Sequence, residues 1–207
     1  MCCSRLYLEV VLTPQVSVAL IAMHDMDAVF APWSRSPAVR QLLTQLGMRR
    51  PMPMQSMLIT KSPQIGGVVV PHQDSCFLHT TPDSCVGIWL ALEDARRDNG
   101  CLWAIPRSHE HGVAGRFILT PERKTRWADG KPPSYAPFSE TEASGYIPLE
   151  APARTLVVLH GACVHASAAN TSTVSRHAYS VHYIEADATW EASNWLQRAP
   201  DFPPVPL

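Results

Sequence analysis

Residues 66–74 read GGVVVPHQD, a strand-like apolar run that ends in a histidine and an aspartate two positions apart. In an extended chain, residues i and i+2 point to the same face. His72 and Asp74 can therefore both contact one small ligand, and a divalent metal ion is the obvious candidate. The pair is a weak signal by itself, because a surface loop that carries two polar residues reads the same way.

Short apolar or alternating runs, separated by Pro, Gly, Asn and Asp, predict β-strands along much of the chain. They cover residues 54–61, 66–72, 85–93, 100–106, 155–161 and 177–186. Asp98-Asn99-Gly100 gives a tight-turn signal between two of them. Strands at this spacing predict a β-sandwich or barrel.

Two other segments have a different texture. Residues 36–48 predict an amphipathic helix, with Pro37 at its start, Gly47 near its end and Val39, Leu42, Leu43 and Leu46 at helical spacing. Residues 106–153 are polar and rich in Pro, Arg, Ser and Glu, so we expect a long insertion loop there. Long loops in compact domains are often functional lids.

The composition fits one domain with a substantial core, since 46% of the 207 residues are hydrophobic. Nineteen prolines against ten glycines are typical of a β-rich or mixed fold. A net charge of -1 with 17% charged residues gives no nucleic-acid footprint and no basic membrane face. The six cysteines form no C-x-x-C pair, which favours free thiols in a reducing compartment.

The N-terminus is mildly apolar, but Glu9 and the Thr13-Pro14-Gln15 break interrupt it. We therefore expect neither a signal-peptide core nor a membrane span. The Cys2-Cys3 pair could be S-acylated, although most such pairs are not, and the C-terminal PPVPL is no peroxisomal address. A soluble cytoplasmic protein is the expectation.

Two ligands leave a divalent metal underdetermined, and the later histidines can supply a third. The candidates are His160, His165, His177 and His182. Each alone is more often an ordinary strand or loop histidine. Gly161 interrupts the predicted strand that ends at His160, so His165 enters the next extended segment and shares its face with Ser167. We therefore predict His165 as the ligand and His160 as a core or supporting histidine.

Two histidines and one carboxylate with open positions form the facial triad of non-haem iron(II) oxygenases. Iron bound in this way needs an oxidisable co-substrate. Arg176 could anchor the distal carboxylate of that co-substrate, because an arginine at the mouth of a barrel is costly to bury without a carboxylate. Taken alone, a surface ion pair explains Arg176 equally well.

At this point ordered blocks of sequence become recognisable. They are MLITKSPQ (57–64), PHQD (71–74), WLALED (89–94), DNGCLWAIPRSH (98–109), HASAANTSTVSR (165–176) and TWEASNWLQ (189–197). From about Met23 to the C-terminus, the sequence resembles the phytanoyl-CoA dioxygenase family. The order and spacing of the blocks carry this resemblance, since no single block is specific.

The resemblance implies a mainly β fold with flanking helices, the double-stranded β-helix (jelly-roll, cupin-like) of Fe(II)/2-oxoglutarate dioxygenases. Such enzymes use dioxygen to hydroxylate a small molecule, with release of succinate and CO2. The resemblance places the metal ligands at His72, Asp74 and His165. It places the co-substrate contacts at Met57, Trp89, Ser167 and Arg176, the last on the C5 carboxylate of 2-oxoglutarate. Met57 and Trp89 would also pass as ordinary core residues.

The chain departs from the family at its N-terminus. Family members carry more sequence there, including helices that support the barrel and a basic residue that helps hold 2-oxoglutarate. Residues 1–20 do not resemble that region. We therefore expect an N-terminally shortened form, with an atypical segment at 1–20 and a single dioxygenase domain at 21–207.

Two other classes of function stay open. A shortened domain could bind the metal and 2-oxoglutarate without turnover. A zinc hydrolase could use the same ligands, although no motif nominates the general base that it needs. The sequence does not identify the substrate. A set of basic residues could contact the phosphates of CoA, but a solvent-exposed basic loop explains them better. These residues are Arg96, Arg97, Arg116, Arg123, Lys124 and Arg126.

Overall fold

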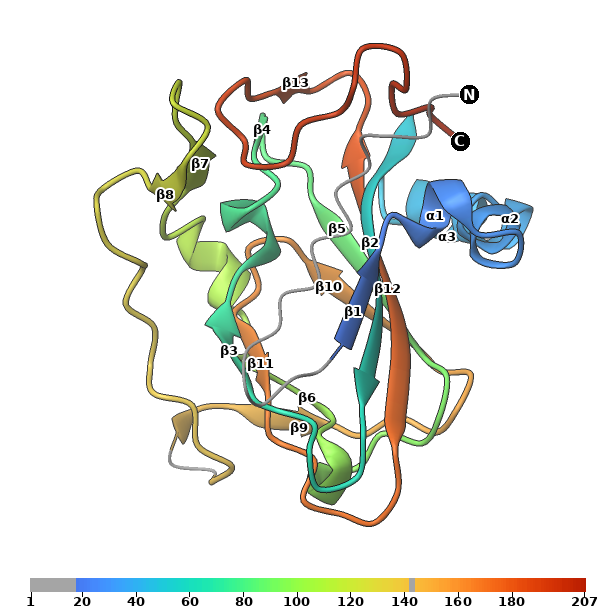
Figure 1. Ribbon diagram of the computed structural model, residues 1–207, viewed down its shortest axis with the longest axis vertical. Helices are drawn as coiled ribbons and strands as arrows, with labels where there is room; N and C mark the ends of the chain where they lie inside the picture. The colour runs from blue at the N-terminus through green and yellow to red at the C-terminus, as the bar shows by residue number, and fades with distance from the viewer. Residues whose placement is uncertain (1–17, 142–143) are drawn as a thin grey trace.

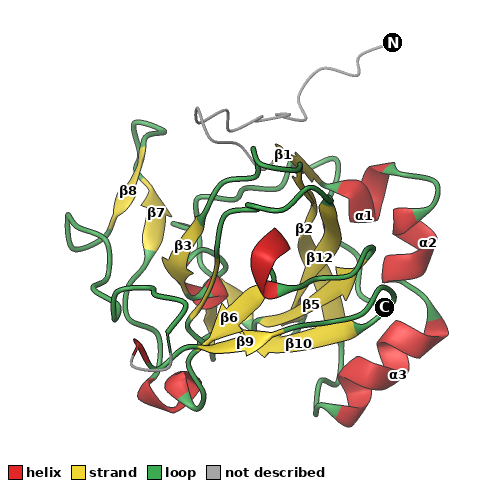
Figure 2. Ribbon diagram, turned by 90° about the horizontal axis from the view of Figure 1, so that it is seen from below, coloured by secondary structure: helices red, strands yellow, loops and turns green. Residues whose placement is uncertain are grey.

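Two antiparallel sheets face each other, and three short helices lie on one side of the larger sheet (Figures 1 and 2). The computed structural model describes residues 18–141 and 144–207. The five-stranded sheet has the order β1-β2-β12-β5-β10, and the four-stranded sheet has the order β3-β11-β6-β9. This architecture confirms the expected jelly-roll fold.

The elements have the following bounds. The larger sheet consists of β1 (Val18–Ile21), β2 (Pro51–Lys61), β12 (Arg176–Glu185), β5 (Val86–Ala91) and β10 (Leu156–His160). The smaller sheet consists of β3 (Val69–His72), β11 (His165–Ser167), β6 (Leu102–Ala104) and β9 (Ile147–Leu149). Two small pairs are β4 (Thr80–Thr81) with β13 (Thr189–Trp190) and β7 (Phe117–Leu119) with β8 (Thr125–Trp127). The helices are α1 (Met23–Met26), α2 (Phe30–Ser34) and α3 (Pro37–Gln45), and the 3-10 turns are η1 (Asp74–Cys76), η2 (Arg97–Asn99) and η3 (Ser108–His111).

Strand β12 is the centre of the fold, because it pairs with β2 on one side and β5 on the other. Its outward residues, among them Tyr179, Val181 and Tyr183, form a buried cluster with Val39 and Leu43 of α3. Its alternate residues therefore point into the space between the sheets. With both faces covered, the strand is buried along nearly its whole length.

The predicted elements are found with shifted ends. Each of the six predicted runs contains a strand, and Ser36 caps α3 by accepting from the Val39 amide. β2 begins earlier than expected, at Pro51, and β3 begins only at Val69. Helix α3 ends at Gln45, which leaves Leu46 exposed instead of on the packed face.

The segment 106–153 is more structured than a loop. Its end supplies β9, which pairs with β6, and Ala151 bridges to Ala95. The ring of Tyr146 is buried in the same core cluster as Trp103. A three-residue edge strand that contains Pro148 has too little alternation to be recognised, although proline is tolerated at a sheet edge.

The N-terminal expectations fall partly outside the described residues. Residues 1–17, with Cys2 and Cys3, belong to that part, whereas 18–21 form β1 and extend the larger sheet beside β2. The cysteines at 76, 85, 101 and 163 are free thiols. None of the helices among the described residues has the length and hydropathy to cross a membrane.

Candidate metal centre and anion pocket

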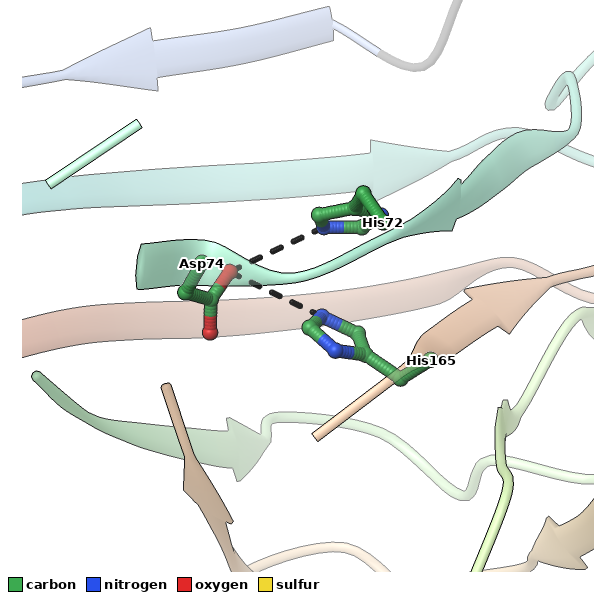
Figure 3. A group of neighbouring side chains, drawn as sticks. All are labelled: His72, Asp74 and His165. Carbon is green, nitrogen blue, oxygen red and sulfur yellow. Dashed lines mark ion pairs between the residues drawn. The ribbon is translucent and has the colours of Figure 1, made fainter. Parts of the chain in front are cut away.

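His72, Asp74 and His165 meet between the two sheets (Figure 3). One carboxylate oxygen of Asp74, Oδ1, lies 3.7 Å from Nε2 of His72 and 3.7 Å from Nε2 of His165. One ligand atom from each of the three residues falls within 4.8 Å of the other two. That separation suits ligands of a single metal ion.

The backbone sets this arrangement. His72 ends β3 and Asp74 opens the turn η1, with Gln73 in an extended conformation between them. His165 opens β11 directly opposite His72. At the break between His160 and His165, a Cβ on Gly161 would lie 2.2 Å from Oγ of Ser75, so the close approach of these two loops requires glycine.

The imidazoles are held in the form that a metal needs. Nδ1 of His72 lies 2.8 Å from the Val70 carbonyl oxygen, and Nδ1 of His165 lies 3.0 Å from that of Cys163. A carbonyl oxygen only accepts, so Nδ1 carries the proton and Nε2 keeps its lone pair. Burial, reinforced by the neighbouring His165, lowers the pKa of His72 to about 4, so His72 is neutral at physiological pH.

The carboxylate of Asp74 also contacts a fourth residue, His182. Nε2 of His182 lies 3.2 Å from Oδ2, the oxygen that faces away from the two ligand histidines. Burial alone would raise the pKa of Asp74, but the charges of His182 and His165 hold it well below its usual range. A Cβ on Gly87 would come within 3.2 Å of the same oxygen, so this glycine leaves room for the carboxylate.

A cavity of about 360 Å³ extends from this cluster to Arg176. Ser167 and Trp89 line it together with the three candidate ligands. Arg176 is only 1% exposed, which excludes the surface ion pair as its explanation. Its Nε donates to the Gly100 carbonyl oxygen at 3.0 Å, and its guanidinium carbon lies 5.4 Å from the ring centroid of Trp89. Its Nη1 has no hydrogen-bond partner among the described residues.

Two paired strands form one wall of the cavity. In the register of β12 with β2, Arg176 stands opposite Lys61, Ser180 opposite Met57 and His182 opposite Gln55. Directly opposed residues in an antiparallel pair share a face. This wall therefore has Arg176 at one end, with Lys61 paired opposite it, and the histidine that contacts Asp74 at the other end.

The structure brings all the residues predicted for the site to one cavity. Met57, Trp89, Ser167 and Arg176 line it together with His72, Asp74 and His165. His160 was expected as a core or supporting histidine, and the core alternative is wrong. It ends β10 with an exposed side chain and packs against His109 at a centroid distance of 5.0 Å. The alternation of an edge strand turns it outward.

The remaining candidates lie elsewhere. Nδ1 of His177 pairs with Oε2 of Glu93 at 2.6 Å, away from the cavity. The basic residues considered for CoA phosphates are exposed and do not line the cavity; they are Arg96, Arg97, Arg116, Arg123, Lys124 and Arg126.

Sequence reasoning missed Lys61 and Gly87, and it considered His182 only as a candidate for the third metal ligand. Lys61, at the end of β2, is fully buried beside Arg176, and nothing in the local sequence marks it. The role of Gly87 depends on a close approach that only the fold reveals. His182 had a usable signal, since it lies six residues after Arg176 and hence on the same face of β12.

The chain is therefore a jelly-roll protein in which a His-Asp-His cluster and a buried arginine line one cavity. The sequence pattern of the family described as Phytanoyl-CoA dioxygenase (PhyH) matches residues 13–178. The chain belongs to this family, as the ordered sequence blocks indicated.

Curated relatives support the same membership. Phytanoyl-CoA dioxygenase 1 of Oryza sativa subsp. japonica is 47% identical over 187 residues, which cover 90% of this chain and 63% of the relative. Phytanoyl-CoA dioxygenase domain-containing protein 1 of Mus musculus is 42% identical over 200 residues, which cover 94% of this chain and 67% of the relative. The chain spans 60% of the length of the Arabidopsis thaliana phytanoyl-CoA dioxygenase, which is 45% identical to it.

Solved structures share the fold at low sequence identity. The epimerase SnoN, in complex with Fe3+, alpha ketoglutarate and nogalamycin RO, has a TM-score of 0.69 at 20% identity and covers 93% of this chain and 73% of its own. EctD from S. alaskensis, in its apoform, has a TM-score of 0.65 at 20% identity and covers 92% of this chain and 65% of its own. These likenesses support the jelly-roll assignment.

Proposed function

We propose that this chain is an Fe(II)- and 2-oxoglutarate-dependent dioxygenase domain that hydroxylates a small molecule and forms succinate and CO2. One observation carries the proposal: a cluster able to hold a metal and a buried arginine with a free donor line the same cavity. 2-Oxoglutarate has a chelating end for a metal and a carboxylate for an arginine, so it suits both.

The donor set fits Fe(II). Two imidazole nitrogens and one carboxylate oxygen match the facial triad, which leaves coordination positions for a co-substrate and dioxygen. Bound iron would supply the redox chemistry that activates dioxygen. The hydrogen bonds from Nδ1 of His72 and His165 to backbone carbonyls fix the ring orientation, as ligand histidines require.

Arg176 would hold the C5 carboxylate of the co-substrate. Its Nε is already bonded to the Gly100 carbonyl oxygen, which fixes the guanidinium, and Trp89 supports it from one face. The unpartnered Nη1 remains to donate to a carboxylate in a charge-assisted bond. Ser167 lines the same cavity as Arg176 and His165 and would donate its hydroxyl to the same ligand.

The rest of the cavity wall is mostly apolar, which excludes water and favours an apolar portion of the substrate. This wall includes Ile59, Val69, Val70, Phe77, Leu102, Leu159 and Trp195. The ring centroid of Phe77 lies 5.5 Å from those of both Phe117 and Trp127 in the β7–β8 hairpin. The segment 106–153 would thereby support the substrate side of the cavity.

Two other classes of function remain as competitors. A zinc hydrolase needs a general base near the metal-bound water. Beyond the three candidate ligands, the ionisable groups among the described lining residues are Arg176 and His182, and His182 is engaged with Asp74. Binding of metal and 2-oxoglutarate without turnover is the stronger competitor, because the chain spans only three fifths of the Arabidopsis relative.

The test is turnover of the co-substrate. Protein loaded with Fe(II) under argon is mixed with 2-oxoglutarate, then with oxygenated buffer, and succinate and CO2 are quantified with and without candidate substrates. We expect equal amounts of succinate and CO2, increased by a true substrate, and none from Asp74→Ala. Binding of both ligands without succinate would favour the non-catalytic domain, and no binding of 2-oxoglutarate would reject the proposal.

A further inference from the structure

Lys61 is a buried cation that the site described so far does not use. It is the last residue of β2 and is 0% exposed, whereas lysine is almost never fully buried unless it is paired. It follows Gln55, Met57 and Ile59 at two-residue steps on the face that lines the cavity. Lys61 stands opposite Arg176 in the β2–β12 pair, but it does not line the cavity itself.

The side chain of Lys61 is fixed in one conformation. Its Nζ donates to the Ala168 carbonyl oxygen, next to the cavity-lining Ser167. A Cβ on Gly66 would lie 2.6 Å from Cβ of Lys61, and a Cβ on Gly100 would lie 2.8 Å from its Cδ. Two close backbone approaches therefore clamp the lysine from either side. Gly100 also accepts from Nε of Arg176, so one residue contacts both cations.

Neither cation is paired with a carboxylate in the part of the chain that the structure describes. No carboxylate of residues 18–141 or 144–207 lies within ion-pair distance of Lys61 or Arg176. The charged and titratable groups that influence Lys61 are Arg176, Cys101 and Glu140. Burial, and then the charge of Arg176, lower the pKa of Lys61 to about 7. Burial raises the pKa of Cys101 to about 11, so this thiol stays neutral near physiological pH.

We propose that Lys61 is the second cation of the dicarboxylate site, a positioning residue that takes up a proton from solvent when the co-substrate's carboxylate binds to Arg176. This inference rests on the proposed function of the site. A carboxylate at Arg176 offsets the repulsion between the two cations, so the charged form of Lys61 becomes favoured. Charged Lys61 in turn attracts the ligand through the poorly screened interior and holds Ala168, and with it Ser167, in place.

Proton uptake distinguishes this role from simple packing. An uncharged side chain of similar length fills the same space between Gly66 and Gly100, but it cannot exchange a proton. If Lys61 were only a spacer, 2-oxoglutarate would bind without net proton transfer at this position. By linkage, the proposed role also makes the affinity for 2-oxoglutarate rise as the pH falls from about 9 to about 7.

The experiment is calorimetric titration of Ni(II)-loaded protein with 2-oxoglutarate at about pH 8, in buffers of different ionisation enthalpy. Nickel(II) should occupy the candidate metal site without supporting turnover. We expect the parent to take up between about half and one proton per site. Lys61→Met should lose this uptake and bind 2-oxoglutarate roughly tenfold more weakly at about pH 7. The matched control is Lys124→Met, since Lys124 is exposed between β7 and β8 and should behave as the parent.

A second measurement needs no variant. Uptake by the parent should fall toward zero at about pH 6, where Lys61 is already charged in the free protein. Binding of 2-oxoglutarate with no proton uptake at either pH would overturn the role of Lys61 and leave the proposed function intact. The same holds if Lys61→Met takes up as many protons as the parent. No binding of 2-oxoglutarate to the parent would instead reject the proposed function, and the role of Lys61 with it.

Discussion

The two ends of the cavity differ in how their buried charges are balanced. At the metal end, the carboxylate of Asp74 faces three imidazoles, those of His72, His165 and His182. At the other end, Lys61 and Arg176 stand opposite each other, with no carboxylate within ion-pair distance in the described parts of the chain.

This difference indicates what each end needs from a ligand. Buried charges that are paired are tolerated, whereas unpaired ones lower the stability of the folded protein. We therefore expect the metal end to select its ligand by geometry, through the positions of nitrogen and oxygen donors. We expect the cationic end to select an anion by charge. Substitutions should accordingly change metal affinity at one end and anion affinity at the other.

The largest effect is expected at the metal end. Asp74→Ala removes the only carboxylate of the candidate triad, so Co(II) or Fe(II) binding should weaken by more than about 100-fold, beyond what loss of a supporting partner costs. Metal content after purification under argon and a Co(II) titration measure this. Circular dichroism checks that the variant is folded.

Paired histidine variants sharpen the same test. His165→Ala should lose the metal as Asp74→Ala does, whereas His160→Ala should retain it, because His160 is exposed at the end of β10. Retained metal in His165→Ala together with loss in His160→Ala would reverse the assignment of the third ligand.

The next effect concerns the anion end. Arg176→Ala removes a charge-assisted contact, so the affinity for 2-oxoglutarate should fall by about 100-fold while metal binding is unchanged. Lysine at this position should restore only part of the loss, since it lacks the fork of donors. Arg126→Ala, on the exposed β8, is the control. An unchanged affinity in Arg176→Ala would exclude this arginine from the site.

A smaller effect should come from His182, which contacts the oxygen of Asp74 that faces away from the other histidines. His182→Phe keeps a ring of similar shape but removes this contact, so Co(II) affinity should fall by about tenfold. His177→Phe on the same strand is the control, because His177 pairs with Glu93 away from the cavity. Equal metal affinities in the two variants would reduce His182 to a packing role.

The site residues that were predicted from the sequence could be found by local rules. His72 and Asp74 lie two apart, and period-two geometry alone puts them on one face. Gly161 marks the break that separates His160 from His165, and Arg176 opens a strand of visible alternation. These signals sufficed because each concerns a single strand and its ends.

What the sequence could not show depends on contacts between strands. The outward orientation of His160 follows from the position of β10 at the edge of the larger sheet. A lysine at a strand end normally faces solvent, and only the register of β2 with β12 and the approach of two glycine backbones bury Lys61. The domain division at residue 20 and the cytoplasmic location stay predictions.

The last prediction tests the unbalanced charge through the pH dependence of stability. Lysine titrates at 10.5 in its ordinary environment but at about 7 in the folded protein, so between these values the unfolded chain binds more protons than the folded one. The free energy of unfolding of the ligand-free parent should therefore rise with pH across this window, and below about pH 7 the cost of the buried charge is present in full.

Lys61→Met has no such titration. The free energy of unfolding of this variant minus that of the parent should therefore be largest below about pH 7 and should shrink by about 2 kcal/mol between about pH 7 and about pH 9. Urea unfolding at several pH values measures the difference, and exposed Lys124→Met should show none of this trend. A difference that stays constant with pH would mean that Lys61 keeps its proton in the folded protein, and that the cationic end is balanced after all.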